Sequence, residues 1–190
     1  MRIFLQSLGL FVLLSMMATH AAPLTLEGLM NKMQAVKSRQ AIFNEKRSLQ
    51  MLEEPLLSSG VLNYQYPNHL EKITRQPKQE TLNITDNSII LTTRGKTRSI
   101  PLKSYPALWG FVESIRATLA GDRATLQKFY QIQLSGEEQN WSMVLIPKNK
   151  DMAWQVRRIN LKGKQAFLQS MEVIETSGDE SLLTITEIKP

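Results

Sequence analysis

The chain has 190 residues, of which 42% are hydrophobic and 7% aromatic, and its 23 basic and 17 acidic side chains give a formal net charge of +6. This composition is ordinary for one folded domain and excludes global disorder, while the positive excess favours acidic surfaces without indicating nucleic-acid binding. The chain contains no cysteine, which excludes disulfides and cysteine-ligated metal sites.

The first 21 residues have the pattern of a cleaved export signal. Arg2 supplies the positive end, residues 3–18 the apolar middle, and Thr19-His20-Ala21 a small-x-small cleavage site. An uncleaved membrane anchor is the weaker alternative, because polar residues interrupt a stretch that is shorter than the roughly 20 apolar residues of a membrane span. We therefore predict a signal peptide over residues 1–21 and one exported domain over residues 22–190, in a bacterial periplasm. This domain is expected to be monomeric, and it has no cysteine after the cleavage site that could carry a lipid.

Residues 25–36 predict an amphipathic helix, because apolar side chains recur every three or four residues after Thr25, which suits the N-cap. The period then changes to the alternation that is typical of strands. Strands are predicted from residue 41 onward and over residues 57–66, 69–75, 80–85, 88–94 and 97–102, with short turns between them.

A helical insertion interrupts the strands. Residues 106–120 carry apolar side chains at helical spacing between Pro106 in the first turn and Gly121 after the last, and Asp122 is predicted to cap a second short helix through Lys128. Strands resume over residues 130–134, 141–146, 154–161, 165–176 and 181–188, with turns at Ser135-Gly136, residues 147–150, Lys162-Gly163-Lys164 and residues 177–179.

The predicted fold class is mainly β (α+β), with about ten or eleven antiparallel strands, an N-terminal helix and one inserted helical segment. A sheet of this size twists and curls rather than staying flat. We therefore expect an unclosed, curved half-barrel whose concave side is covered by the helices.

Catalytic chemistry has little support in the sequence. His69 is the one histidine after the predicted signal, so a serine hydrolase triad would have to use it, and a solvated loop histidine is the simpler interpretation. Adjacent carboxylates fall in polar turns where neighbouring side chains diverge, at Glu53-Glu54, Glu137-Glu138 and Asp179-Glu180. We predict no enzyme activity, no cofactor and no metal.

The conspicuous residues are apolar and lie on the inserted helix and on the strands. They can form an ordinary packed core, or they can line an acyl-chain cavity beneath the helix, because ligand sites are concave and mostly apolar. Composition leaves both interpretations open. The predicted residues of a hydrophobic cargo cavity are Phe43, Leu62, Tyr64, Tyr66, Leu82, Ile84, Leu91, Leu108, Phe111, Ile115, Trp141 and Leu145.

A group of basic residues lies between positions 148 and 164, where Asp151 is the single acid. Turns at both ends of the strand 154–161 would spread this charge along a stripe. A solvated face is the simple interpretation, and docking to an acidic membrane partner is the functional one. The predicted docking residues are Lys148, Lys150, Arg157, Arg158, Lys162 and Lys164.

The order of these features resembles the LolA family of periplasmic lipoprotein carriers, and its divergent LolA-like branch in particular. The matching segments follow the N-terminal helix and end in the insertion: Phe43, Ser59-Gly60-Val61-Leu62, Tyr66-Pro67, Thr74-Arg75-Gln76-Pro77, residues 82–91 and residues 113–122. Two positions depart from the family pattern. Tyr66 stands where a basic residue usually ties the sheet to the helical lid, and a tryptophan common in the next strand is absent, with Ile73 nearby.

The resemblance implies a hydrophobic cavity under a helical lid. It also implies a carrier that takes acylated cargo, a lipoprotein or another lipid-linked molecule, from an inner-membrane exporter and passes it to an outer-membrane acceptor. Because Tyr66 brings no charge, lid control and cargo are expected to differ from those of LolA itself. The alternative function is a sensor or interaction module on the same fold, with a fully packed interior.

Overall fold

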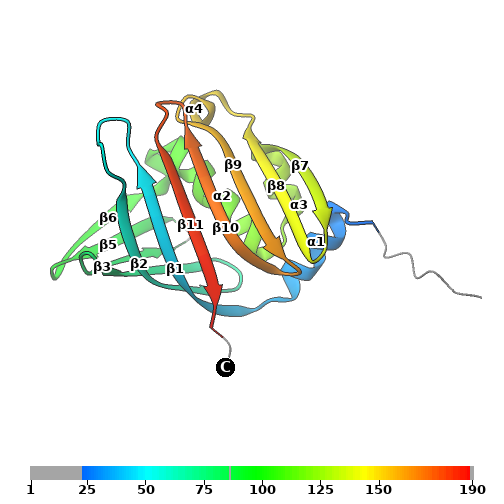
Figure 1. Ribbon diagram of the computed structural model, residues 1–190, viewed down its shortest axis with the longest axis horizontal. Helices are drawn as coiled ribbons and strands as arrows, with labels where there is room; N and C mark the ends of the chain where they lie inside the picture. The colour runs from blue at the N-terminus through cyan, green and yellow to red at the C-terminus, as the bar shows by residue number, and fades with distance from the viewer. Residues whose placement is uncertain (1–22, 86, 189–190) are drawn as a thin grey trace, which may run out of the picture.

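The computed structural model describes residues 23–85 and 87–188, so the predicted signal peptide lies outside the described residues. Eleven antiparallel strands form one sheet in the order β6-β5-β4-β3-β2-β1-β11-β10-β9-β8-β7 (Figure 1). Their bounds are β1 Ser38–Ser48, β2 Leu56–Gln65, β3 His69–Gln76, β4 Glu80–Ile84, β5 Ser88–Thr93, β6 Lys96–Pro101, β7 Tyr130–Glu137, β8 Asn140–Pro147, β9 Val156–Lys164, β10 Phe167–Glu175 and β11 Glu180–Glu187.

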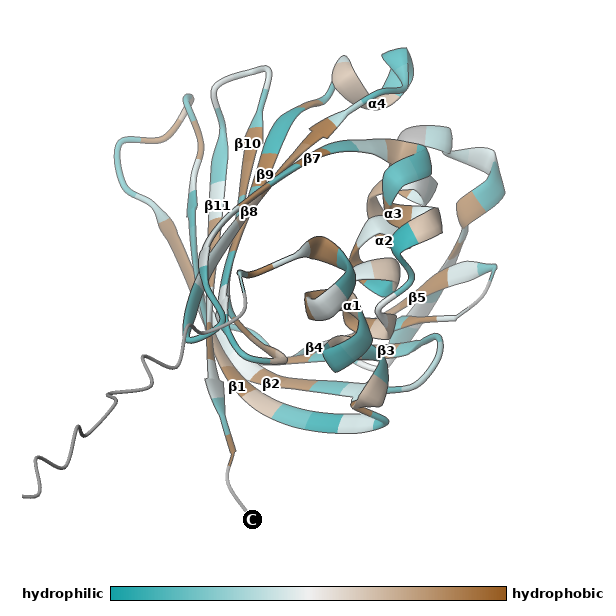
Figure 2. Ribbon diagram, turned by 90° about the vertical axis from the view of Figure 1, so that its right-hand side faces the viewer, coloured by the Kyte–Doolittle hydropathy of each residue, from teal (hydrophilic) through white to brown (hydrophobic). Residues whose placement is uncertain are grey.

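The helices gather on the concave side of this curved sheet, where α1, α2 and α3 lie together (Figure 2). Their bounds are α1 Leu26–Ala35, the 3-10 helix η1 Leu102–Ser104, α2 Pro106–Ala120, α3 Arg123–Phe129 and α4 Lys150–Ala153. The predicted half-barrel with an N-terminal helix and an inserted helical segment is therefore confirmed. Within residues 23–85 and 87–188, no helix has the length and apolar character needed to cross a membrane.

Local signals set the ends of the helices. Thr25 Oγ1 accepts a hydrogen bond from the Gly28 amide at 3.0 Å, and Asp122 Oδ1 accepts one from the Thr125 amide at 3.0 Å. Gly121 ends α2 in the left-handed conformation, with φ 69°, where a side chain would also collide with the Met30 carbonyl oxygen of α1. This glycine therefore both stops α2 and allows α1 to pack against it.

β9 begins at Val156, whereas the sequence predicts a strand from residue 154, and the short helix α4 lies just before it. The side chain of Asn149 caps α4 by accepting hydrogen bonds from the amides of Asp151 and Met152 at 2.8 and 3.4 Å. Met152 is 2% exposed and lies against Gly110 of α2. A polar cap and one buried side chain are too short a pattern to reveal a four-residue helix.

The turn predicted at Lys162-Gly163-Lys164 is also wrong, because these residues belong to β9. The chain turns one residue later, at Gln165, whose φ is 52°. Gly163 serves packing, since the Trp141 indole lies directly on it and a Cβ would collide with the ring. A glycine in a strand thus marks a close approach here rather than a turn.

Packing on the concave side is uneven. The main core fills the half of the half-barrel formed by β7 to β10, where α1 and α3 cover the sheet with Leu29, Met30, Met33 and Leu126. A smaller cluster of Ile84, Ile89, Leu102 and Val112 attaches α2 to β4 and β5. The central strands lie between these two packed regions.

Candidate functional site

A cavity of about 560 Å³ lies between the concave face of the sheet and α2. Its volume falls within the roughly 300–1,000 Å³ that is typical of small-molecule sites. The wall comes from β1 to β5, β10 and β11, and most of the lining is apolar. From α2 the cavity receives Leu108, Phe111, Val112, Ile115 and Leu119.

Several of the predicted cavity residues are brought together in this wall, although they come from three different elements. Because β2 and β4 turn alternate side chains to the concave face, residues far apart in the chain meet beneath α2. These residues are Leu62, Tyr64, Leu82, Ile84, Leu108, Phe111 and Ile115. Their role in holding cargo stays a prediction.

Trp141 and Leu145 do not line the cavity and must be reassigned. Both are fully buried in the main core, with exposed fractions of 0% and 1%. Trp141 Nε1 donates a hydrogen bond to the Gln165 carbonyl oxygen at 2.8 Å, which fixes the indole on Gly163. The sequence shows that such residues face inward, but not which half of the interior is filled.

Phe43, Tyr66 and Leu91 also lie outside the lining. Phe43 is fully buried, and the Lys72 ammonium stands 4.8 Å from its ring centroid. Tyr66 follows the end of β2, is 38% exposed, and has the Lys37 ammonium 4.0 Å from its ring centroid. Leu91 pairs with Leu82 of β4. It lies closer to the turn between β5 and β6 than Ile89, which is the residue of β5 that lines the cavity.

The sequence interpretation missed other parts of the wall. Apolar residues on α1, β1, β10 and β11 contribute to it, and so do charged residues on β1 and β3. A signal for the charged part of the wall was present on β1. The positions that face inward are Ala41, Phe43, Glu45 and Arg47, so the same face of the strand is apolar in its first half and charged in its second half. The missed residues include Met33, Ala41, Met171, Val173, Leu183, Ile185, Glu45 and Lys72.

Glu45 and Lys72 form an ion pair in the cavity wall, with 2.6 Å between Lys72 Nζ and Glu45 Oε2. Their side chains are only 21% and 27% exposed, respectively. Ser58 Oγ donates to Glu45 Oε2 at 2.9 Å, and Ser181 Oγ donates to Oε1 at 3.1 Å. Burial raises the pKa of Glu45, but Lys72 and the two hydroxyls outweigh burial and hold the pKa below its ordinary value.

The lowered pKa of Glu45 predicts a pH-dependent contribution to stability. A depressed folded-state pKa stabilises the folded chain above the ordinary carboxyl value of 4.5, and this stabilisation disappears as the pH falls through the folded-state value. The wild type should therefore lose its stability advantage over Glu45→Gln below about pH 4.5. Urea unfolding of both proteins at a series of pH values measures this, and a constant difference down to strongly acid pH would contradict it.

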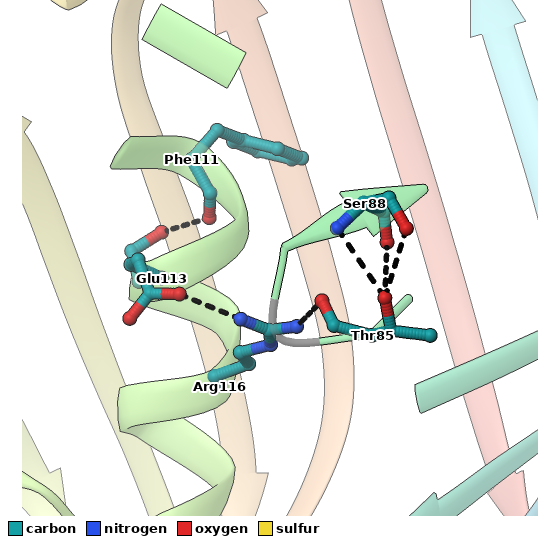
Figure 3. A network of polar contacts seen from close by, with 6 residues as sticks. Thr85, Ser88, Phe111, Glu113 and Arg116 are labelled. Carbon is teal, nitrogen blue, oxygen red and sulfur yellow. Dashed lines mark hydrogen bonds and ion pairs between the residues drawn. The ribbon is translucent and has the colours of Figure 1, made fainter. Parts of the chain in front are cut away.

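The buried residue Arg116 connects α2 to the turn between β4 and β5 (Figure 3). Its Nη1 donates to Glu113 Oε1 at 2.7 Å, and its Nη2 donates to the Thr85 carbonyl oxygen. Arg116 is 6% exposed, and its buried Nε has no partner within the described chain. The helix over the cavity thus carries its own cationic anchor to the sheet, while Tyr66 on the sheet is uncharged.

Replacing this anchor is expected to destabilise the protein. Arg116→Met keeps much of the side-chain volume but removes two charge-assisted hydrogen bonds, so the free energy of unfolding should fall by about 1.5–3 kcal/mol. Arg123→Met is the matched control, because the Arg123 side chain is 48% exposed and lies 3.4 Å from Glu27, an arrangement worth about 0–1 kcal/mol. If urea unfolding shows the same loss of unfolding free energy in both variants, Arg116 stabilises the protein no more than an exposed ion pair does.

The predicted docking residues lie on the surface around β9. Lys148 and Lys150 precede one end of β9, and Lys162 and Lys164 lie near the other end, inside the strand. Trp154, beside α4, is 83% exposed. All six basic residues, Lys148, Lys150, Arg157, Arg158, Lys162 and Lys164, are exposed. Whether they bind a partner stays a prediction.

His69 is exposed at the start of β3. The described residues contain no group of three or more histidine and acidic side chains placed to hold a metal ion.

The chain was compared with solved structures, with curated proteins and with models of protein families. Among solved structures, the chain is similar to a LolA superfamily protein, NE2245 from Nitrosomonas europaea, with 9% identity over 88% of this chain and 94% of that one and a TM-score of 0.48. It is similar to a chain of the Pseudomonas aeruginosa MucA/MucB complex, with 10% identity over 85% and 54% of the two chains and a TM-score of 0.49. LprF from Mycobacterium bovis matches with 11% identity over 85% and 89% and a TM-score of 0.35.

A search of curated proteins finds no match. The family model for LolA-like outer membrane lipoprotein carrier proteins matches residues 18–186, which is nearly the whole chain. The chain therefore belongs to the LolA-like family of outer membrane lipoprotein carrier proteins.

Proposed function

We propose that this protein is a non-catalytic periplasmic carrier. It binds the acyl chains of a lipoprotein, or of another lipid-linked cargo, in the cavity beneath α2 and carries them from the inner to the outer membrane. The working form is residues 22–190, a single domain released by cleavage after Ala21. An inner-membrane exporter supplies the cargo, and an outer-membrane acceptor receives it.

The observation that carries this proposal is the apolar cavity of about 560 Å³ between the sheet and α2. Burial of acyl carbon contributes about 0.8 kcal/mol per methylene, so one long chain supplies on the order of 10 kcal/mol of gross transfer energy. This is enough to hold a chain during aqueous transit. Release then requires movement of α2 or a more apolar acceptor, because the carrier needs a state of lower affinity.

The direct test is recovery of the protein with its native cargo. The full chain, with its own N-terminal segment, is expressed in a bacterium with two membranes and purified from the periplasmic fraction without detergent. Mass spectrometry of the extracted protein is expected to show acylated molecules, and its N-terminal sequence is expected to start at Ala22. Absence of acylated cargo, combined with no binding of fluorescent acyl probes, would refute the carrier function.

The basic residues around β9 are proposed as the docking surface for the donor or the acceptor. Charge reversal at Arg157 and Lys162 should weaken capture of an acidic partner by about tenfold or more, because like charges across an interface cost several kcal/mol. Acyl-probe binding should not change, since neither residue lines the cavity. Crosslinking in membrane fractions measures capture, and reversal at Lys96 and Arg98 of β6, which are also exposed, is the control.

The alternative is a sensor or interaction module that uses the same basic surface without carrying lipid. A filled interior would suit that function, whereas the open space under α2 favours the carrier. The two functions separate experimentally: a sensor keeps partner capture when its cavity is blocked, and a carrier loses cargo transfer.

A further inference from the structure

The cavity wall contains charged side chains whose formal charges cancel. Three are basic and three are acidic: Arg39, Arg47 and Lys72, and Glu45, Glu71 and Glu175. Apolar side chains in the same places would often give equal or greater stability, because burying an ion pair costs desolvation energy that the attraction between its charges often fails to exceed. Their presence therefore points to a role in choosing the ligand, as with the few polar groups that orient ligands in apolar pockets.

Each of these basic side chains already has an acidic partner. Arg47 lies 3.7 Å from Glu175, and Arg39 lies 3.5 Å from Glu187 beyond the cavity. Glu71, in turn, accepts a hydrogen bond from the Asn63 amide at 2.7 Å. Among the described residues that line the wall, every cation therefore has an acidic partner, so none is left to pair with an incoming anion.

The Glu45–Lys72 pair is the least exposed of the ion pairs in the wall. Glu45 accepts hydrogen bonds from Lys72, Ser58 and Ser181, so its oxygens are well occupied. Lys72 differs, because its ammonium carries three N–H groups. Within residues 23–85 and 87–188, Glu45 is the one hydrogen-bond acceptor that the structure gives it. The wall therefore presents a hydrogen-bond donor with a carboxylate directly beside it.

A ligand oxygen that accepts from Lys72 must lie close to the Glu45 carboxylate. A neutral ester or amide carbonyl can do this without adding charge to the cavity. An ionised fatty acid brings a second carboxylate beside Glu45 and loses its hydration as it enters. Lys72 alone would attract such an anion, but Glu45 beside it cancels that attraction, so the pair does not replace the hydration that the anion loses.

We propose that the cavity selects acyl chains joined through neutral ester or amide linkages and rejects ionised free fatty acids, with Lys72 donating to the carbonyl oxygen and Glu45 excluding the carboxylate. This inference rests on the proposed carrier function and specifies its cargo. Such selection would allow the carrier to exclude free fatty acids, which have the same acyl chain but end in an ionised carboxylate.

The test compares two fluorescent probes with the same pyrene-labelled long chain, one a free fatty acid above its pKa and the other its glycerol monoester. The wild type should bind the monoester at least about tenfold more tightly than the acid. A factor of ten corresponds to about 1.4 kcal/mol, which is less than the cost of a contact between like charges. Glu45→Gln removes the repelling charge and leaves Lys72 unpaired, so it should tighten acid binding and reduce the preference to about threefold or less.

Glu138→Gln is the matched control, since it removes the same charge from an ion pair with Lys32 that lies outside the cavity lining. It should leave the preference near the wild-type ratio. Lys72→Gln is the reciprocal variant and serves as the test if Glu45→Gln does not fold. It replaces the charged donor with a neutral amide and leaves Glu45 charged, so it should weaken monoester binding and widen the preference against the acid.

The outcomes separate the inference from the function on which it rests. If the wild type binds neither probe, the carrier function itself fails. If it binds both equally, or if the preference is unchanged in Glu45→Gln and Lys72→Gln while binding persists, the selection by charge is overturned and the carrier function stands.

Discussion

An Ile115→Glu variant is expected to bind long-chain acyl probes about 30-fold more weakly than the wild type while keeping its fold. Ile115 lies on α2 and lines the cavity, where an acyl chain would cover the new carboxylate. Burying an uncompensated polar group costs about 2 kcal/mol or more, which corresponds to a factor of about 30 in affinity. In the unliganded protein Ile115 is only partly buried, so the glutamate can stay hydrated and the cost to folding is smaller.

The measurement is titration of a neutral acyl ester followed by probe fluorescence, with urea unfolding as the check on folding. Ile42→Glu is the matched control, because Ile42 is 45% exposed and lies on the face of β1 opposite Ala41 and Phe43. It makes the same chemical change outside the cavity and should bind like the wild type. If the two variants bind equally well, the space beneath α2 is not the acyl site.

A Trp141→Ala variant is expected to lose about 3–5 kcal/mol of the free energy of unfolding. Trp141 is fully buried, packs on Gly163, and donates to the Gln165 carbonyl oxygen at 2.8 Å. Its loss leaves a void in the main core and an unpaired carbonyl. Because domains of this kind are stable by about 5–15 kcal/mol, the variant should be partly unfolded under mild denaturing conditions.

Far-UV circular dichroism in urea measures this loss without relying on tryptophan fluorescence. Trp154→Ala is the control, because Trp154 is 83% exposed beside α4 and its removal should change stability by less than about 0.5 kcal/mol. A loss below 1 kcal/mol in Trp141→Ala would mean that the neighbouring core closes over the void. It would also weaken the assignment of Trp141 to packing rather than to the cavity.

The architecture could be predicted because its signals are local. Alternation along residues 57–66 and helical spacing over residues 106–120 each lie within one element, and α2 has the predicted bounds. The errors occurred where one signal has two physical causes. A glycine can mark a turn or a close contact, and Gly163 is the contact.

The cavity could be predicted only in part, because its wall depends on which inward side chains meet another layer. Trp141 and Ile115 are both apolar and inward, yet one is covered by core residues and the other borders open space. Nothing in their own segments distinguishes them. The charged wall residues were missed for a related reason, since the pairing of Glu45 with Lys72 joins two strands that are separated by β2 in the sheet.

The position of β1 between β2 and β11 has a consequence for the order in which the molecule is made. Most neighbouring strands are joined by short connections, but β1 and β11 are not, and Glu45 and Ser181 in them are 136 positions apart. Closing so long a segment costs entropy before any contact forms. Because the chain is synthesised from its N-terminus, β1 to β6 can pair early. The edge of β1 that faces away from β2 then has no hydrogen-bonded neighbour until β11 has been made. That strand brings Leu183 and Ile185, so the wall of the cavity is complete only after β11 has been synthesised.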